Sequence, residues 1–191
     1  MLFHISEEQG IERFEPRPSH FCDAPVVWAV DQDHLRNYLV PRECPRVTYY
    51  AGPATTPADV DRFLLSSTAV VAIEHGWWKR LQACRLYGYH FSPETFECQD
   101  ECAGYYVSQV AVVPERVEIF EDPMGELMKR GVELRALPNL WTLRDAVVAS
   151  TLRYSIIRMT NALPRHNEHS SETTGLSFTG SDKRKSYGGT C

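Results

Sequence analysis

The chain has 191 residues, of which 43% are hydrophobic and 24% are charged, and its formal net charge is -5. This composition is typical of a soluble domain and disfavours a uniformly basic nucleic-acid binder. No stretch reaches the roughly 18 uninterrupted apolar residues that span a bilayer, and the start at Met1 lacks the basic flank and apolar core of an export signal. We therefore expect a cytoplasmic protein with no membrane contact and no extended nucleic-acid partner.

Eight short runs are rich in β-branched or aromatic residues and are bounded by Pro, Gly or Ser, a pattern typical of strands. The predicted strands cover residues 2–6, 25–31, 46–51, 69–74, 85–91, 105–113, 116–120 and 132–137.

Helix signals lie between these strands. Thr56 followed by Pro57 predicts a capped helix start, and Asp122 followed by Pro123 predicts another, which Gly131 ends. Shorter helices are expected after Asp31 or Asp33 and over residues 77–84.

The longest helix is predicted from Asn139 to about Asn161. Apolar side chains recur there at three- and four-residue spacing, which predicts one core-facing stripe. The stripe consists of Leu140, Leu143, Val147, Thr151, Tyr154 and Ile157 or Arg158.

Residues 164–191 are dominated by Ser, Thr, Gly and charged side chains, and such a composition cannot bury enough apolar surface to offset the entropy of ordering. We predict a single α+β domain over residues 1–163 and a disordered polar tail over 164–191. Strands interrupted by helices and followed by a long C-terminal helix indicate a split sheet that is mixed or antiparallel.

Side chains alternate across a strand, so His4 and Ser6 share one face of the first strand while Phe3 and Ile5 share the other. The two polar side chains can address one ligand. A histidine on a strand is, on its own, more often structural than catalytic.

The motifs LFHIS, GIERFEPR, VVWAVDQDHLRNYL and GYYVSQVAVVPERV occur in an order that resembles the ADP-ribosyltransferase-like superfamily. A longer set, LFHIS, FEPR, VVWAVDQDHL, PRECPRVTYY, DECAGYYVS and STLRYSIIRMTNA, is similar to an uncharacterised bacterial family known only as a domain of unknown function. The second resemblance covers residues 1 to about 163.

The superfamily resemblance implies an ADP-ribosyltransferase-like split sheet and NAD as the substrate. In that mapping His4 contacts the nicotinamide ribose, Ser6 is its hydroxyl neighbour, and Trp28 or the adjacent Val27 stacks on nicotinamide. Cleavage of the glycosidic bond also needs a carboxylate that stabilises an oxocarbenium-like ribose. The Glu-x-Glu pair of the superfamily is replaced here by Ser-Gln-Val at residues 108–110, so Glu101, or Asp100 beside it, is the predicted catalytic carboxylate.

Three more residues are predicted to bind the substrate. Arg17 and Arg46, with Arg42 as a further candidate, could hold a pyrophosphate through forked hydrogen bonds, or could pair with a nearby Glu. Tyr105 and Tyr106 point to opposite faces of their strand, so at most one lines a cleft, and we assign Tyr106 to it.

No metal site is expected, because Cys98 and Cys102 lack the Cys-x2-Cys spacing of structural zinc sites. Two functions remain open: an NAD-dependent ADP-ribosyl transferase or glycohydrolase, and a non-catalytic module on the same scaffold that binds a nucleotide or a partner. The absent Glu-x-Glu pair favours the second.

Overall fold

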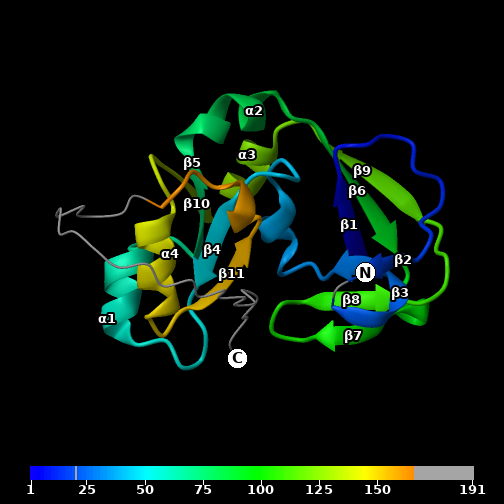
Figure 1. Ribbon diagram of the computed structural model, residues 1–191, viewed down its shortest axis with the longest axis horizontal. Helices are drawn as coiled ribbons and strands as arrows, with labels where there is room; N and C mark the ends of the chain where they lie inside the picture. The colour runs from blue at the N-terminus through cyan, green and yellow to red at the C-terminus, as the bar shows by residue number, and fades with distance from the viewer. Residues whose placement is uncertain (20, 166–191) are drawn as a thin grey trace, which may run out of the picture.

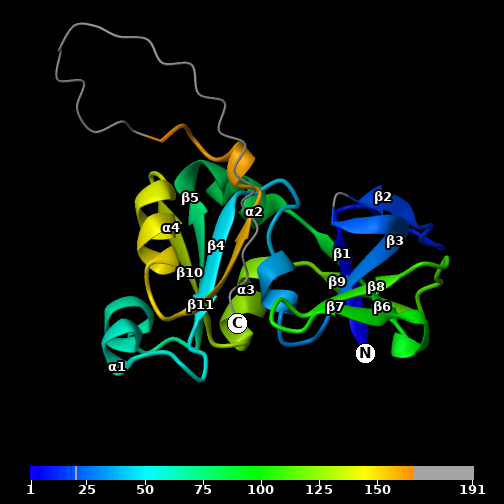
Figure 2. The ribbon, with the colours of Figure 1, turned by 60° about the horizontal axis from the view of Figure 1, so that its bottom comes forward.

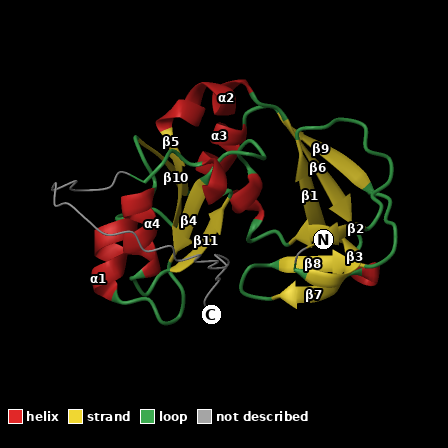
Figure 3. Ribbon diagram, in the orientation of Figure 1, coloured by secondary structure: helices red, strands yellow, loops and turns green. Residues whose placement is uncertain are grey.

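The computed structural model describes residues 1–19 and 21–165, which fold into two β-sheets that stand side by side, with the helices gathered around one of them (Figure 1, Figure 3). The predicted α+β class is confirmed, and the strands divide between an antiparallel sheet and a mixed sheet.

The first sheet is antiparallel and curls into a half-barrel (Figure 2). Its strand order is β7-β8-β3-β1-β6-β9, and β2 pairs with β3 outside this path. The strands are β1 (Leu2–Ser6), β2 (Arg17–Ser19), β3 (Cys22–Val30), β6 (Leu86–Phe91), β7 (Glu97–Asp100), β8 (Tyr105–Ser108) and β9 (Arg116–Phe120).

The second sheet is mixed, with the order β10-β5-β4-β11, and only the β10–β5 pair is parallel. All six residues of β5 are buried, since the strand is central and both of its faces are covered. The strands are β4 (Arg46–Tyr50), β5 (Ala69–Glu74), β10 (Val132–Leu137) and β11 (Arg153–Ile157), and the helices are α1 (Pro57–Asp59), α2 (Trp78–Ala83), α3 (Pro123–Lys129) and α4 (Trp141–Val148).

Both predicted helix caps are confirmed. The Thr56 hydroxyl accepts a hydrogen bond from the Asp59 amide at 3.3 Å, and an Asp122 carboxylate oxygen accepts one from the Gly125 amide at 2.9 Å. Gly131 follows α3 with a φ of 69°, as expected of a glycine that ends a helix.

One hydrophobic cluster joins the two sheets. It includes Phe3 and Leu86 from the first sheet, Val71 and Ile73 from the second, and Leu39 from the segment between β3 and β4. Each sheet buries its other face in a separate cluster. A continuous hydrophobic core therefore holds the two sheets against each other.

The predicted long helix over residues 139–161 is wrong. Helix α4 ends at Val148. The chain then enters β11, which pairs with β4 through five consecutive residue pairs. Ser150 ends the helical pattern because its hydroxyl donates to the Val147 carbonyl at 2.6 Å and accepts from the Leu152 amide at 3.2 Å. The backbone groups of β11 then pair with the edge of β4, whereas a helix would have paired them within itself.

Two other elements are shorter than predicted. The strand that begins at Tyr105 ends at Ser108, and beyond it Val112 forms only an isolated bridge with Phe14. The helix expected after Asp31 is a single 3₁₀ turn, Leu35–Tyr38.

The predicted disordered tail lies outside the described residues from 166 onward. Within the described part, no helix is long and apolar enough to cross a membrane.

Candidate functional site: a cleft between the two sheets

A cleft of about 780 Å³ lies between the sheets, within the size range of small-molecule sites. One wall comes from β1, β3 and β8 of the first sheet, and the other comes from β11 and the end of α4. Residues 154–158 all line the cleft. A strand that faced the cleft with one side would expose only alternate residues to it. The backbone edge of β11 therefore lines the cleft together with its side chains.

His4 reaches this cleft from β1, the blue strand beside the N-terminus in Figure 1. Its Nδ1 lies 2.9 Å from the Trp28 carbonyl oxygen, which can only accept, so Nδ1 carries the proton and Nε2 is left with a lone pair. Burial lowers the pKa of His4, the bond to Trp28 opposes that change, and the charges of Arg42 and Arg17 lower the pKa further. His4 is therefore a neutral imidazole that can accept a proton.

This lowered pKa predicts how stability depends on pH. In the unfolded chain His4 titrates near its ordinary value of about 6.5, so below that pH the unfolded state binds the proton more readily. The contribution of neutral His4 to the free energy of unfolding is complete above pH 6.5. It is lost as the pH falls through the lower pKa that His4 has in the folded state. In urea denaturation, we expect the free energy of unfolding to drop less between pH 7.5 and 5.5 in His4→Asn than in the wild type.

Aromatic side chains form a row across the cleft. The rings of Phe21 and Trp28 lie 6.4 Å apart, and those of Trp28 and Tyr105 lie 5.8 Å apart, both edge to face. The Tyr38 hydroxyl then donates to the Tyr105 hydroxyl at 3.0 Å, which links the first sheet to the segment that precedes β4. The row runs from the exposed Phe21 to the buried side of the cleft.

Arg46 stands at the buried end of this row, with 2% of its surface exposed. Its guanidinium donates to the backbone carbonyls of Asn37, Cys44 and Arg42 at 2.7, 2.9 and 3.3 Å, and it lies over the Tyr38 ring at 5.4 Å. Burial lowers the pKa of Arg46. Across residues 1–19 and 21–165, Arg46 forms no ion pair with a carboxylate, so the cleft contains a desolvated positive charge that lacks a counter-ion.

The cleft as a whole is basic although the protein is acidic. Its two carboxylates are already engaged: Glu7 accepts from the Arg42 amide at 2.8 Å and from Arg80 at 3.3 Å, and Asp100 accepts from the Ala103 amide at 3.0 Å. The arginines that line it are Arg42, Arg46, Arg144 and Arg158. This excess of positive charge favours an anionic ligand.

Four of the seven predicted site residues come together here: His4, Ser6, Trp28 and Arg46 line the cleft. The Ser6 hydroxyl is buried and accepts from the Glu8 amide at 3.0 Å, so it positions the turn after β1.

The other three predicted residues lie elsewhere. Arg17 is exposed on β2 and acts on the cleft only through its charge on His4. Glu101 is exposed in the turn after β7, whereas the neighbouring Asp100 lines the cleft. Tyr106 points to the opposite face of β8, toward a shallow hollow beside Asp31, because strand side chains alternate and Tyr105 takes the cleft side.

Sequence reasoning missed Tyr38, Arg144 and Arg158 as cleft residues. The error at Arg158 followed from assigning residues 153–157 to a helix. The run RYSII ends in two consecutive β-branched residues, and this was the one local signal for a strand.

Among the described residues, no group of three or more His, Cys, Asp or Glu side chains is placed to hold a metal ion. Histidine, aromatic and arginine side chains line the cleft.

Comparison with known proteins identifies the family. Residues 3–162 match the family described as "Family of unknown function (DUF6886)". The chain belongs to this family. No curated protein and no solved structure matches the chain, so neither comparison supports the resemblance to ADP-ribosyltransferases. The family match spans both sheets and every residue that lines the cleft.

Proposed function

We propose that the cleft between the sheets binds a nucleotide that carries phosphate, of the NAD or ADP-ribose type. The observation that carries this proposal is the row of side chains from Phe21 and Trp28 through Tyr105 and Tyr38 to Arg46, which has no carboxylate partner among the described residues. A nucleotide of this type combines the same two parts, a flat aromatic base and an anionic phosphate group, in one small molecule.

The side chains at both ends of this row fit a nucleotide that carries phosphate. Trp28 is half-buried and Phe21 is exposed, so their rings offer apolar area against which a base or a nicotinamide can stack. Arg46 is already desolvated, so a phosphate that reaches it gains a charge-assisted hydrogen bond without a further dehydration cost on the protein side. A volume of about 780 Å³ accommodates a ligand of this size.

The test is a calorimetric titration of the full chain with NAD and with ADP-ribose. We expect Trp28→Leu to weaken binding by about fivefold or more, because base–aromatic stacking is worth about 1–3 kcal/mol. The matched control is Trp77→Leu, which removes another half-buried tryptophan outside the cleft and should leave the affinity unchanged. Absence of binding by both nucleotides would overturn the proposal.

A second candidate function is cleavage of NAD at its nicotinamide bond, with transfer of ADP-ribose to water or to another acceptor, as the resemblance to ADP-ribosyltransferases implies. It is favoured by the presence of Asp100 in the same cleft as His4. The bond from the ribose carbon to nicotinamide would break, nicotinamide would leave with the bonding electrons, and Asp100 would stabilise the resulting cation. The attacking water would give its proton to Nε2 of His4.

This candidate predicts different effects for neighbouring carboxylates. Asp100→Asn keeps the acceptor that holds the Ala103 amide but removes the charge, so we expect release of nicotinamide from labelled NAD to fall by a hundredfold or more while binding persists. Glu101→Gln, one residue away and exposed, should leave the rate unchanged. If NAD binds but releases no nicotinamide, the cleft serves binding alone.

A further inference from the structure

Arg158 has an unusual backbone conformation at the edge of the cleft. It directly follows β11 and has a φ of 57° and a ψ of 29°, in the left-handed helical region. Among the described residues, only Leu65 and Arg158 have a positive φ without being glycine. The left-handed region is unfavourable for an arginine because its Cβ crowds the backbone, and such residues cluster at functional sites.

The surrounding contacts hold Arg158 in this conformation. On one side Ile157 pairs with Arg46 in the β11–β4 ladder, and on the other the Asn161 amide donates to the Arg158 carbonyl at 2.9 Å. The chain then continues to Leu163, whose amide donates to both carboxylate oxygens of Glu74 at 3.1 and 3.0 Å. A glycine would make this reversal without strain, so the turn alone does not explain an arginine here.

The side chain of Arg158 lines the cleft beside Arg46. Both residues line the cleft, and the charge of Arg158 acts on the Arg46 guanidinium. Both charges act on the hydroxyl of Tyr38, which lies under the Arg46 guanidinium. Two arginines that converge on one place, one of them without a carboxylate partner among the described residues, form an arrangement that a bound anion would stabilise.

We propose that Arg46 and Arg158 form the phosphate subsite of the cleft, and that Arg158 exchanges its ion pair with Glu43 for a phosphate group of the ligand. This inference rests on the proposed function and adds to it the residue that fixes where the phosphate lies. The ligand chemistry is a phosphate group, either a terminal phosphomonoester or a diphosphate, that carries about two negative charges in total.

The existing partner of Arg158 is suited to such an exchange. Its Nη2 lies 3.4 Å from a Glu43 oxygen, and the two side chains are 41% and 46% exposed, so water screens their attraction. Glu43 keeps other partners when Arg158 leaves. They are the side-chain amide nitrogen of Asn161 at 3.1 Å and the guanidinium of Arg42 at 3.9 Å. The exchange therefore leaves no carboxylate unpaired.

The test measures binding of inorganic phosphate and pyrophosphate to the full chain by calorimetry, in the wild type and in Arg158→Gly. We expect the variant to lose tenfold or more in affinity, because a charge-assisted hydrogen bond is removed. We also expect its melting temperature to stay level or rise, because glycine relieves the left-handed conformation. A loss of binding without a loss of stability separates a ligand contact from a structural role.

Leu65→Gly is the matched control. It relieves the other positive φ at a residue that is 71% exposed and outside the cleft, so stability should respond similarly and affinity should not change. Glu43→Gln keeps the oxygen that accepts from Asn161 and releases Arg158, so it should bind pyrophosphate more tightly than the wild type does.

Equal affinity in the wild type and in Arg158→Gly would overturn the inference even if NAD binds. Pyrophosphate binding that depends on Arg158, together with no binding of NAD or ADP-ribose, would support the phosphate subsite and overturn the nucleotide proposal. Titration with AMP and ADP-ribose then distinguishes a terminal phosphate from a diphosphate as its occupant.

Discussion

Arg46→Met is expected to lower the free energy of unfolding by about 3–5 kcal/mol. The substitution keeps the apolar stem but removes the donors for the carbonyls of Asn37, Cys44 and Arg42. An acceptor left unsatisfied in the interior costs about 1–3 kcal/mol. Because these carbonyls shape the segment between β3 and β4, their release would also loosen Tyr38 and the buried end of the aromatic row. Chemical denaturation monitored by tryptophan fluorescence measures the change.

Arg42→Met provides the comparison for Arg46→Met. The Arg42 side chain is 61% exposed, and its only ion pair among the described residues, with Glu43, has an N–O distance of 3.9 Å, so the same chemical change should cost less than about 1 kcal/mol. If the two variants proved equally stable, the guanidinium of Arg46 would not hold the segment between β3 and β4. Ligand binding would then be the remaining explanation for its burial.

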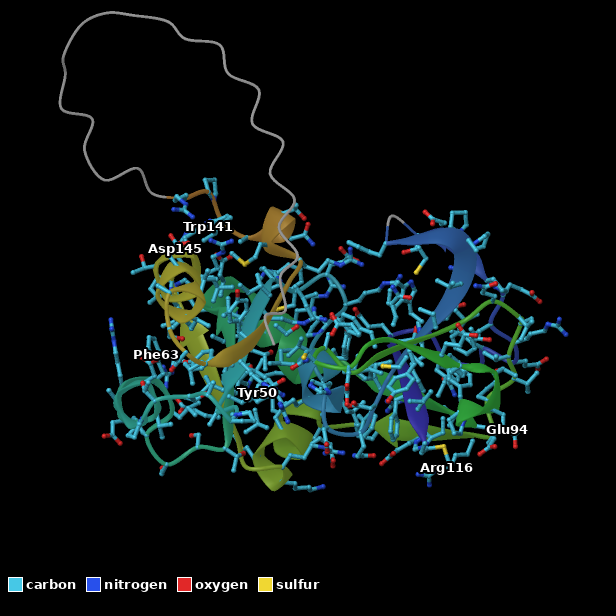
Figure 4. All side chains as sticks on the ribbon, turned by 90° about the horizontal axis from the view of Figure 1, so that it is seen from below. Tyr50, Phe63, Glu94, Arg116, Trp141 and Asp145 are labelled. Atoms are coloured by element: carbon cyan, nitrogen blue, oxygen red, sulfur yellow. The ribbon has the colours of Figure 1, made fainter. Side chains whose placement is uncertain are left out.

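Gly104→Ala is expected to cost about 3 kcal/mol or more. Gly104 has a φ of 65°, and a Cβ there would lie 2.6 Å from an Asp31 oxygen and still closer to Nδ1 of His34. These two side chains are hydrogen-bonded at 2.8 Å, and His34 in turn contacts the Tyr50 hydroxyl at 3.0 Å, near the centre of the molecule in Figure 4. The added methyl group must therefore displace a network that joins the end of β3 to β4, besides straining its own backbone.

Gly10→Ala isolates the backbone part of that cost. Gly10 has a φ of 78°, but a Cβ there meets nothing within 4 Å, so we expect a loss of only about 1 kcal/mol from the left-handed conformation. Since Tyr105 directly follows Gly104, Gly104→Ala should also weaken nucleotide binding, whereas Gly10→Ala should not. Similar melting temperatures for the two variants would contradict the assigned clash with His34.

Local sequence signals predicted the elements whose structure is decided within a few residues. The caps at Thr56 and Asp122 and the glycine at Gly131 lie where expected, because each satisfies backbone groups of its own turn. Strands β1, β5, β9 and β10 have the predicted bounds, since their apolar and β-branched side chains pack on the pleated surface of a sheet wherever they occur.

The candidate site was predicted in part. His4 and Trp28 reach the cleft because strand alternation fixes the face on which a side chain lies. The same rule allows only one of two adjacent tyrosines to line the cleft, and we predicted Tyr106 whereas Tyr105 lines it. The outcome depends on which face of β8 meets the other sheet, which the sequence does not show. The selection of Asp100 over Glu101 likewise depends on the turn after β7.

The sequence by itself determined the α+β class, the polar pair on the first strand and most of the short elements, because these depend on residues near one another in the chain. Only the tertiary structure decided that residues 153–157 form a strand, since the edge of β4 that pairs with them lies about a hundred residues earlier. That pairing brings Arg158 beside Arg46 and closes the second wall of the cleft. The acidic net charge gave no sign of this, because a sum over the chain does not record which charges fold to the same place.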